Sequence, residues 1–406
     1  MWVRRIFFGL AALFLAALLL IAGYAAYPLL HGGALGSLPP ADAQAAPGQA
    51  ADEAQMAKYW QVMSLLERDF YGPKPTAEQR VDGAITGMVQ AFGDPYTFFV
   101  QPQARELERD QLAGKFGGIG ANLEQTAEGY VLSPMLGQPA AGAGIRKGDL
   151  LLAVDGQTIP PDMKVDDLLA LIRGPVGSTV TLLVRRAGEE LTFTITRAEI
   201  QTPSIEWRLL DDTPGSADVG YIRQTIFSER SPQEMDAAVA ALREAGALRF
   251  VWDLRGNPGG LLSAAVAEAD MWLDSGLIVT EERAGGLRKT FEATPGELAA
   301  GAPLVLLVDG GSASASEIVA GALQAHERAK LVGSQTYGKG SVQLIHELAD
   351  QSSLHVTNAQ WYAADGRQIS GHGLTPDIPV AEGDPLAAAL ASLPVVQEAK
   401  MKDTVP

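Results

Sequence analysis

The 406-residue sequence contains no cysteine and only five histidines, which are scattered along the chain. Without cysteine the chain has no disulfide, no thiol nucleophile and no thiolate metal site. The histidines do not have the spacing of metal ligands, so the sequence predicts no metal site. A cysteine-free chain is compatible with an oxidising compartment, although it does not require one.

Positive charge is also scarce. Lys and Arg number 31 against 48 Asp and Glu, the net charge is −17, and no basic cluster occurs. This balance predicts that nucleic acid is not a partner. At 47% hydrophobic residues, a chain of this length has enough apolar side chains for two or three domains with substantial cores.

The first thirty residues are the most apolar part of the chain. Arg4 and Arg5 precede an uninterrupted apolar run over residues 6–23, which continues to residue 30, and no Lys or Arg follows until Lys58. The length of the run favours a transmembrane anchor over the shorter core of a signal peptide, which remains the alternative. The basic end is expected in the cytoplasm and the body outside it, in the periplasm or at the cell exterior. Residues 31–51, rich in Ala, Gly and Pro, are predicted to be a flexible linker.

Residues 52–112 are predicted to be a helical region. Apolar residues recur at helical spacing over residues 56–70 and again over residues 81–92, and a short helix is expected at 104–112. The stripes favour a core between two helices, with a binding groove as the alternative. Residues 93–97, Gly-Asp-Pro-Tyr-Thr, are predicted to be a turn.

In residues 113–198 the predicted secondary structure changes from helices to short strands, with one helix predicted at 165–172. Three segments in order, FGGIG at 116–120, AAGAGIRKGD at 140–149 and VDG at 154–156, resemble a PDZ domain. In that family the glycine loop offers backbone amides to the terminal carboxylate of a peptide. The resemblance therefore implies a peptide-binding loop, with a simple tight turn as the alternative; the loop residues are Phe116, Gly117, Gly118, Ile119 and Gly120.

Residues 199–382 alternate strands and helices, which predicts parallel strands joined by right-handed crossovers. One buried strand ends at Leu254 before a glycine-rich turn, and another ends at Val308 before a turn with three serines. Parallel strands place both turns at one edge of the sheet, where ligands of α/β folds bind.

A serine at a strand-to-helix turn suits a nucleophile, and it equally suits an ordinary helix N-cap. None of the candidate bases His326, His346, His355 and His372 lies in a recognisable catalytic context, and the pattern Gly-x-Ser-x-Gly is absent. Lys339, flanked by glycines, is the other candidate base, and on its own it also fits a solvated turn.

Four ordered blocks resolve these alternatives by resemblance. They are DLRGNPGG at 253–260, SASASE at 312–317, YGKGSVQ at 337–343 and GHGLTPD at 371–377. Together they resemble the carboxyl-terminal processing proteases, which are serine peptidases with a Ser-Lys dyad. The resemblance implies a PDZ domain inserted before a layered α/β protease core of the crotonase/Clp-like kind at 199–382, followed by a C-terminal helix and tail at 383–406.

The resemblance also implies roles for individual residues. The nucleophile falls on Ser314, the general base on Lys339 and a supporting glutamine on Gln343. The oxyanion hole falls on the amide of Ala315 with that of Gly259 or Gly260.

The implied activity is endoproteolysis of exported proteins near their C-termini, through an acyl-enzyme and without a cofactor. The PDZ domain would capture substrates with a free C-terminus. The alternative from another class is a non-catalytic PDZ scaffold that only binds peptides, and acyl-CoA chemistry on a related core is a weaker alternative.

Overall fold

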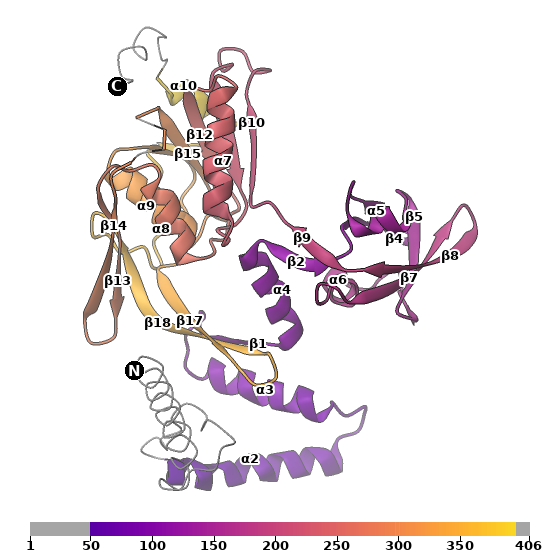
Figure 1. Ribbon diagram of the computed structural model, residues 1–406. Coiled ribbons are helices and arrows are strands. Elements are labelled where there is room, and N and C mark those ends of the chain that lie inside the picture. Colours follow the sequence, from indigo (N-terminus) through magenta and orange to yellow (C-terminus); the bar gives the residue numbers. More distant parts are fainter. Residues whose placement is uncertain (1–48, 297, 300, 395–406) are drawn as a thin grey trace, which may run out of the picture. The chain divides into compact units, whose positions relative to one another are not determined.

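The computed structural model describes residues 49–296, 298–299 and 301–394 (Figure 1). The chain forms two compact units, residues 1–77 and residues 78–406. The predicted anchor at residues 1–30, most of the predicted linker and the tail from residue 395 lie outside the described residues. Within the described ranges, no helix combines the length and the apolar character that a membrane crossing requires.

The helical region contains the helices that the sequence predicts. Their bounds are α2 (Gln49–Asp69), α3 (Ala77–Gln90) and α4 (Pro102–Ala113). Each stripe contains exposed residues, since Trp60 of α2 is 60% exposed and Met88 of α3 is also 60% exposed. Because α2 and α3 belong to different compact units, a core between the two helices stays a prediction. Periodicity identifies residues that share a helix face, but it contains no information about whether anything covers that face.

The PDZ region is built around a six-stranded sheet among the described residues, ordered β3-β4-β5-β7-β8 with β6 beside β5. The strands are β3 (Ala121–Thr126), β4 (Gly129–Pro134), β5 (Asp149–Val154), β6 (Gln157–Thr158), β7 (Thr179–Arg186) and β8 (Glu189–Thr196). Two helices accompany it, α5 (Pro139–Ala143) and α6 (Val165–Ile172). Alternate residues of β7, Val180, Leu182 and Val184, are fully buried, as expected for a strand with one face on a core.

A short antiparallel pair, β2 (Lys115–Gly118) with β9 (Ala198–Gln201), brackets this sheet in the sequence. Three residues of the predicted peptide-binding loop, Phe116 to Gly118, belong to β2, whereas Gly120 has a φ of 67°. A Cβ at Gly117 would lie 2.0 Å from the carbonyl oxygen of Gly174. Close packing therefore already requires glycine at position 117.

Another six-stranded sheet in the described part of the chain belongs to the region of alternating strands and helices, and its strand order is β10-β11-β12-β15-β16-β19. They are β10 (Ile205–Leu209), β11 (Val219–Gln224), β12 (Arg249–Asp253), β15 (Leu304–Val308), β16 (Lys330–Gly333) and β19 (Ile378–Pro379). As predicted, β12 and β15 are parallel neighbours, with Asp253 opposite Leu307. The glycine turn and the serine turn thus leave the sheet at the same edge.

Helices cover both faces of this sheet (Figure 1). Phe250 and Trp252 of β12 join the main core with α7 (Ser231–Glu244), α8 (Leu262–Asp270) and α9 (Ala315–Ala325). Val251, which points the other way, joins a smaller core with α10 (Pro385–Ser392). Alternation along one buried strand therefore produces the layers.

A separate sheet has five antiparallel strands, counted over the described residues, and one of them, β17, begins just after Lys339. Its strands are β1 (Phe98–Val100), β13 (Gly276–Arg283), β14 (Leu287–Ala293), β17 (Ser341–Glu347) and β18 (Ser353–Ala363). Trp361 of β18 belongs to the same core as α9, so the two sheets share their packing.

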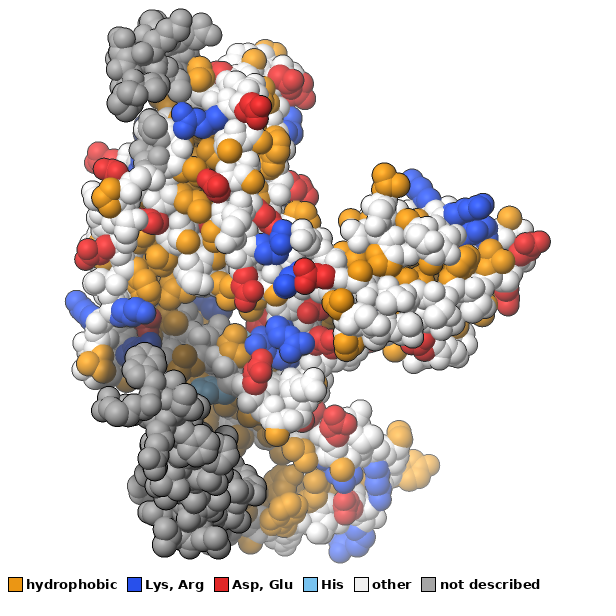
Figure 2. Space-filling model, in the orientation of Figure 1, with side chains coloured by type: hydrophobic (Ala, Val, Ile, Leu, Met, Phe, Trp, Pro, Cys, Tyr) orange, Lys and Arg blue, Asp and Glu red, His pale blue; other side chains and the backbone are white. Residues whose placement is uncertain are grey.

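On the face shown in Figure 2, Lys and Arg side chains are interspersed with Asp and Glu side chains.

Candidate active site

The serine turn connects β15 to α9 and ends at Ser314. The backbone of Ser314 has φ 55° and ψ −113°, a region that residues with a Cβ rarely occupy. The turn is tied to the glycine turn by Asp309, whose Oδ1 accepts hydrogen bonds from Gly311 N at 2.8 Å and Gly256 N at 2.9 Å. A strained residue that is held on both sides by neighbouring loops is typical of a functional position.

The hydroxyls of the three serines have different environments. Ser312 is buried and its Oγ donates to Leu254 O at 2.7 Å. Ser316 is also buried and its Oγ donates to Asn257 O at 3.0 Å. Ser314, by contrast, is partly exposed and lines a cavity. Ser312 and Ser316 thus fasten the serine turn to the glycine turn, whereas Ser314 lines the cavity.

Glu317 connects the serine turn to the loop at residues 336–339, which ends at Lys339. Its buried carboxylate accepts hydrogen bonds through Oε2 from Ser314 N at 2.8 Å and Lys339 N at 2.9 Å. Through Oε1 it accepts from Gly338 N at 2.7 Å and from Thr336 Oγ1 at 2.6 Å. Burial raises the pKa of Glu317, while these hydrogen bonds oppose the rise. One side chain therefore fixes the backbone of Ser314 and Lys339 relative to each other.

Lys339 lies just before β17 and its side chain lines the same cavity as Ser314. Its Nζ donates to Gln343 Oε1 at 2.7 Å and lies 5.5 Å from the centre of the Tyr96 ring. Burial lowers the pKa of Lys339, and the Glu108 carboxylate opposes that decrease. Among the described residues, no hydrogen bond joins Lys339 to Ser314.

The glycine turn approaches the serine turn closely. A Cβ on Gly259 would lie 2.8 Å from Ser314 Cβ and 2.9 Å from Ala315 N. The amide of Gly259 already donates to the buried Asn257 at Oδ1, at 2.9 Å. Gly260 and Ala315 line the cavity, and no backbone hydrogen bond within the described residues engages either amide.

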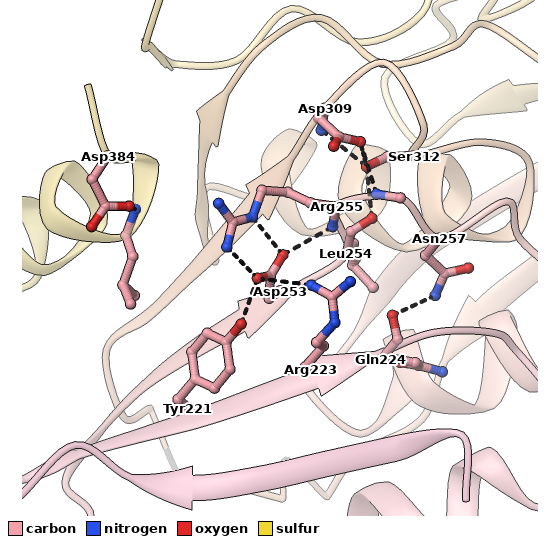
Figure 3. Close-up of polar contacts among 12 residues, drawn as sticks. Tyr221, Arg223, Gln224, Asp253, Leu254, Arg255, Asn257, Asp309, Ser312 and Asp384 are labelled. Carbon is pink, nitrogen blue, oxygen red and sulfur yellow. Dashed lines mark hydrogen bonds and ion pairs between the residues drawn. The ribbon is translucent and has the colours of Figure 1, made fainter. Parts of the chain in front are cut away.

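Polar side chains hold the start of the glycine turn (Figure 3). Arg255 donates to both carboxylate oxygens of the buried Asp253, at 2.9 and 2.6 Å, and Tyr221 OH donates to Oδ2 at 2.6 Å. Burial alone would raise the pKa of Asp253, but these hydrogen bonds outweigh it and the pKa lies below its ordinary value. Further along, Asn257 Nδ2 donates to Gln224 O at 3.1 Å. The turn is therefore fixed from the strand end to the glycines.

The cavity has a volume of about 280 Å³. Its lining includes apolar residues from several elements: Leu112, Leu261, Leu262, Ile318, Val342, Ile345 and Trp361. The polar residues of the lining include Glu108 of α4 and His355 of β18, with His355 Nε2 3.2 Å from Glu108 Oε2. Arg105 Nη1 lies 3.1 Å from the same oxygen. Burial alone would raise the pKa of Glu108, but the contacts with His355 and Arg105 hold it below its ordinary value.

The remaining candidate bases do not reach the cavity. His326 contacts Leu277 O at 2.8 Å and His372 contacts Ser370 O at 2.9 Å. Neither of them, nor His346, belongs to the lining of the described cavity. Nor do the described residues contain a cluster of His, Asp and Glu suited to a metal ion.

Sequence patterns do not reveal several residues that shape the site. Glu317 belongs to the block at 312–317, but the sequence indicates only that it suits a helix start and not that it binds the Lys339 backbone. Asn257 is inconspicuous inside a glycine-rich turn. Glu108 and Tyr96 precede Lys339 by more than two hundred residues, and no motif marks their approach to it.

Known proteins share these features. Residues 218–380 match the model of peptidase family S41, and residues 130–186 match that of the PDZ domain. The carboxy-terminal-processing protease of Bartonella bacilliformis is 36% identical over 336 residues, covering 80% of this chain and 75% of the relative. The carboxyl-terminal-processing protease of Synechocystis is 37% identical over 318 residues, covering 77% and 74%.

A similar solved structure is that of the photosystem II D1 C-terminal processing protease. It is 28% identical to this chain and has a TM-score of 0.47, covering 82% of this chain and 90% of the other. The family models and the relatives define a serine peptidase with a PDZ domain. On the identity and coverage of its relatives, the chain belongs to the carboxyl-terminal processing proteases of peptidase family S41.

Proposed function

We propose that Ser314 is the nucleophile of this peptidase, that Lys339 is its general base and that Gln343 holds the lysine amine. The observation that carries the proposal is that one cavity contains both a partly exposed serine on a strained turn and a half-buried lysine. The buried hydroxyls of Ser312 and Ser316, which donate to backbone carbonyls, support the choice of the middle serine.

A lysine acts as a base only when its amine is neutral. An ordinary lysine is charged at neutral pH, so the lowered pKa of Lys339 supports this role. A neutral amine has N–H donors and one lone pair. Nζ can therefore keep its hydrogen bond to Gln343 while the lone pair accepts the proton of Ser314. Catalytic hydrogen bonds often reach full strength only in the enzyme–substrate complex, so the proposal does not require a Ser314–Lys339 bond among the described residues.

The reaction then proceeds through an acyl-enzyme. Ser314 Oγ attacks the scissile carbonyl carbon as its proton passes to Lys339, and the carbonyl oxygen becomes an oxyanion. The oxyanion collapses, the C–N bond breaks, and the Lys339 ammonium gives its proton to the leaving amine. Water attacks the resulting ester and loses a proton to Lys339, which returns it to Ser314 as the new C-terminus departs.

The oxyanion is stabilised by backbone amides. Ala315 supplies one donor at the start of α9. Of the two glycines, Gly260 is favoured over Gly259 as the second donor, because Asn257 already accepts the hydrogen bond of the Gly259 amide. Gly260 lines the cavity with its amide unpaired in the described backbone network.

The PDZ domain is proposed to bind the free C-terminus of a protein substrate at residues 116–120. These residues form the end of β2 and the connection to β3, and β3 is an edge strand of the described sheet. An edge strand is available for pairing with an extended peptide, which is the binding mode of PDZ domains. No cofactor takes part in this scheme.

The experiment that tests the dyad is cleavage of an unfolded protein by single variants. Ser314→Ala and Lys339→Ala are expected to lose all but about a thousandth of the wild-type rate while remaining folded. Ser312→Ala and Ser316→Ala serve as controls and retain part of the activity, because they remove structural hydrogen bonds only. An active Ser314→Ala together with an inactive Ser312→Ala would show that the nucleophile is Ser312, and would contradict the proposal.

We also infer that residues 1–30 anchor the protein with its body on the extracytoplasmic side of a membrane. The length of the apolar run and the position of Arg4 and Arg5 support this orientation. The N-terminal sequence of the mature protein distinguishes the anchor from a cleaved signal peptide, since cleavage would remove the apolar run.

A further inference from the structure

The supporting glutamine is held by a segment far away in the sequence. Gln343 Oε1 accepts the hydrogen bond from Lys339 Nζ at 2.7 Å, and Gln343 Nε2 donates to the backbone oxygen of Tyr96 at 2.5 Å. Because an amide has an acceptor at one end and donors at the other, the bond to Tyr96 directs Oε1 toward Lys339. Tyr96 belongs to the turn at residues 93–97, between α3 and β1.

Asp94 shapes that turn. Its Oδ1 accepts from Tyr96 N at 3.1 Å and its Oδ2 accepts from Thr97 Oγ1 at 2.6 Å. The Thr97 hydroxyl also accepts from Thr357 N of β18 at 3.1 Å. Burial alone would raise the pKa of Asp94, but these hydrogen bonds hold it below its ordinary value, so the acceptor is a carboxylate at neutral pH.

The turn also touches the lysine directly. Lys339 Nζ lies 5.5 Å from the centre of the half-buried Tyr96 ring, within the range of a cation–π contact. The groups that face the amine are therefore Tyr96 from the turn, Gln343 from β17 and Glu108 from α4. Two of these three depend on where the turn lies.

We propose that Asp94 is a positioning residue for the general base, acting through the Tyr96 carbonyl and Gln343 on Lys339. The carboxylate fixes the Tyr96 peptide against β18, the Tyr96 oxygen orients the Gln343 amide, and the amide holds the lysine amine at the cavity. This inference rests on the proposed function, since it treats Lys339 as the base. A purely structural turn, which only starts β1, is the competing explanation.

A double-mutant cycle between Asp94→Ala and Gln343→Ala distinguishes the two explanations. If Asp94 acts through Gln343, Asp94→Ala lowers kcat about tenfold in the wild-type background, with KM nearly unchanged, because small misplacements of a catalytic group are costly. In the Gln343→Ala background the same change has an effect of less than about twofold, since the Gln343 amide through which Asp94 acts is already absent and only the Tyr96 ring contact still links the turn to Lys339. Equal effects in both backgrounds would overturn the inference.

Asp350→Ala is the matched control. Asp350 forms the same kind of turn between β17 and β18, where its Oδ1 accepts from Ser352 N at 3.0 Å and Ser352 Oγ at 2.6 Å. Neither Asp350 nor Ser352 lines the cavity. We expect kcat of Asp350→Ala to stay within about twofold of wild type. A loss as large as that of Asp94→Ala would show that any broken turn in this sheet impairs catalysis, and would contradict the inference.

Thr97→Val keeps the test decisive if Asp94→Ala does not fold. It removes the hydroxyl between Asp94 and Thr357 with little change in volume, and it is expected to lower kcat in the wild type and not in Gln343→Ala. Loss of kcat in both backgrounds would again count against the inference. Full activity of Lys339→Ala, measured in parallel, would instead overturn the proposed function.

Discussion

At the scale of single residues, the three serines of the turn after β15 alternate with alanines in sequence and have different environments in space. Alternating Ser and Ala contain no signal that selects one hydroxyl, so spacing alone leaves the choice open. Family resemblance selects Ser314, and burial of Ser312 and Ser316 against backbone carbonyls agrees with it. The residues that tune Lys339, by contrast, come from other parts of the chain and could not be predicted from the motifs around it.

One of them, Glu108, leads to a prediction about pH. The Glu108 carboxylate favours the charged form of Lys339, and burial favours the neutral form. Because a neutral base is required, activity rises as pH increases through the pKa of Lys339. Glu108→Gln removes the negative charge, lowers the pKa of Lys339 further and moves this rise to lower pH.

The measurement is the pH dependence of kcat/KM on a short peptide substrate. The control is Glu347→Gln, which removes an exposed carboxylate that also pairs with Arg105, at 3.3 Å, and should leave the rise where it is. A rise that moves to higher pH in Glu108→Gln would contradict this account of the base.

At the scale of elements, the neighbouring parallel strands β12 and β15 are predictable because their buried sequences and the helix between them leave few alternatives. The polar contacts beneath the strands are not predictable in this way. Glu268 of α8 follows the glycine turn in a helix of ordinary sequence, yet it is fully buried. Its Oε1 accepts from Ser231 Oγ at 2.5 Å and from Gln224 Nε2 at 3.2 Å.

Burial raises the pKa of Glu268 from 4.5 to about 8. In the unfolded chain the group ionises near its ordinary value, so between these two pH values the folded protein holds a proton that the unfolded chain has lost. The free energy of unfolding therefore falls as pH rises through this window, by up to roughly 5 kcal/mol. Above about pH 8 the contribution no longer changes.

Glu268→Gln is neutral at every pH and should remove most of this fall. Urea unfolding at pH values near the two ends of the window measures it, with Glu244→Gln, at an exposed position of α7, as the control that keeps the wild-type dependence. If Glu268→Gln retained the pH dependence of the wild type, the buried carboxyl would not be its source.

At the scale of the whole molecule, the order of the parts follows from the sequence, since helical stripes, a glycine-rich β region and alternating strands and helices differ in composition. The apolar stripes of α2 and α3 show the limit of such patterns, because the spacing identifies residues that share a helix face but does not say what covers that face. The proposed joint action of the PDZ domain and the protease core would likewise be a property of the whole chain. It requires one substrate to engage both.

A substrate pair that differs only at its C-terminus tests that joint action. A protein ending in a free carboxylate should be cleaved with a higher kcat/KM than the same protein ending in an amide, because capture of the carboxylate supplies binding energy remote from the scissile bond. We expect a difference of about tenfold or more. Equal cleavage of the two forms would contradict recognition of the carboxylate, whereas the rate on a short internal peptide serves as the control for an intact active site.

The most direct test of the central claim is the site at which a serine-directed fluorophosphonate modifies the protein. The full chain is treated with the probe, digested and analysed by mass spectrometry that distinguishes the three serines at positions 312, 314 and 316. We predict a single adduct on Ser314 in the wild type and no adduct in folded Lys339→Ala. An adduct on Ser312 or Ser316, or undiminished labelling of Ser314 without Lys339, would contradict the account.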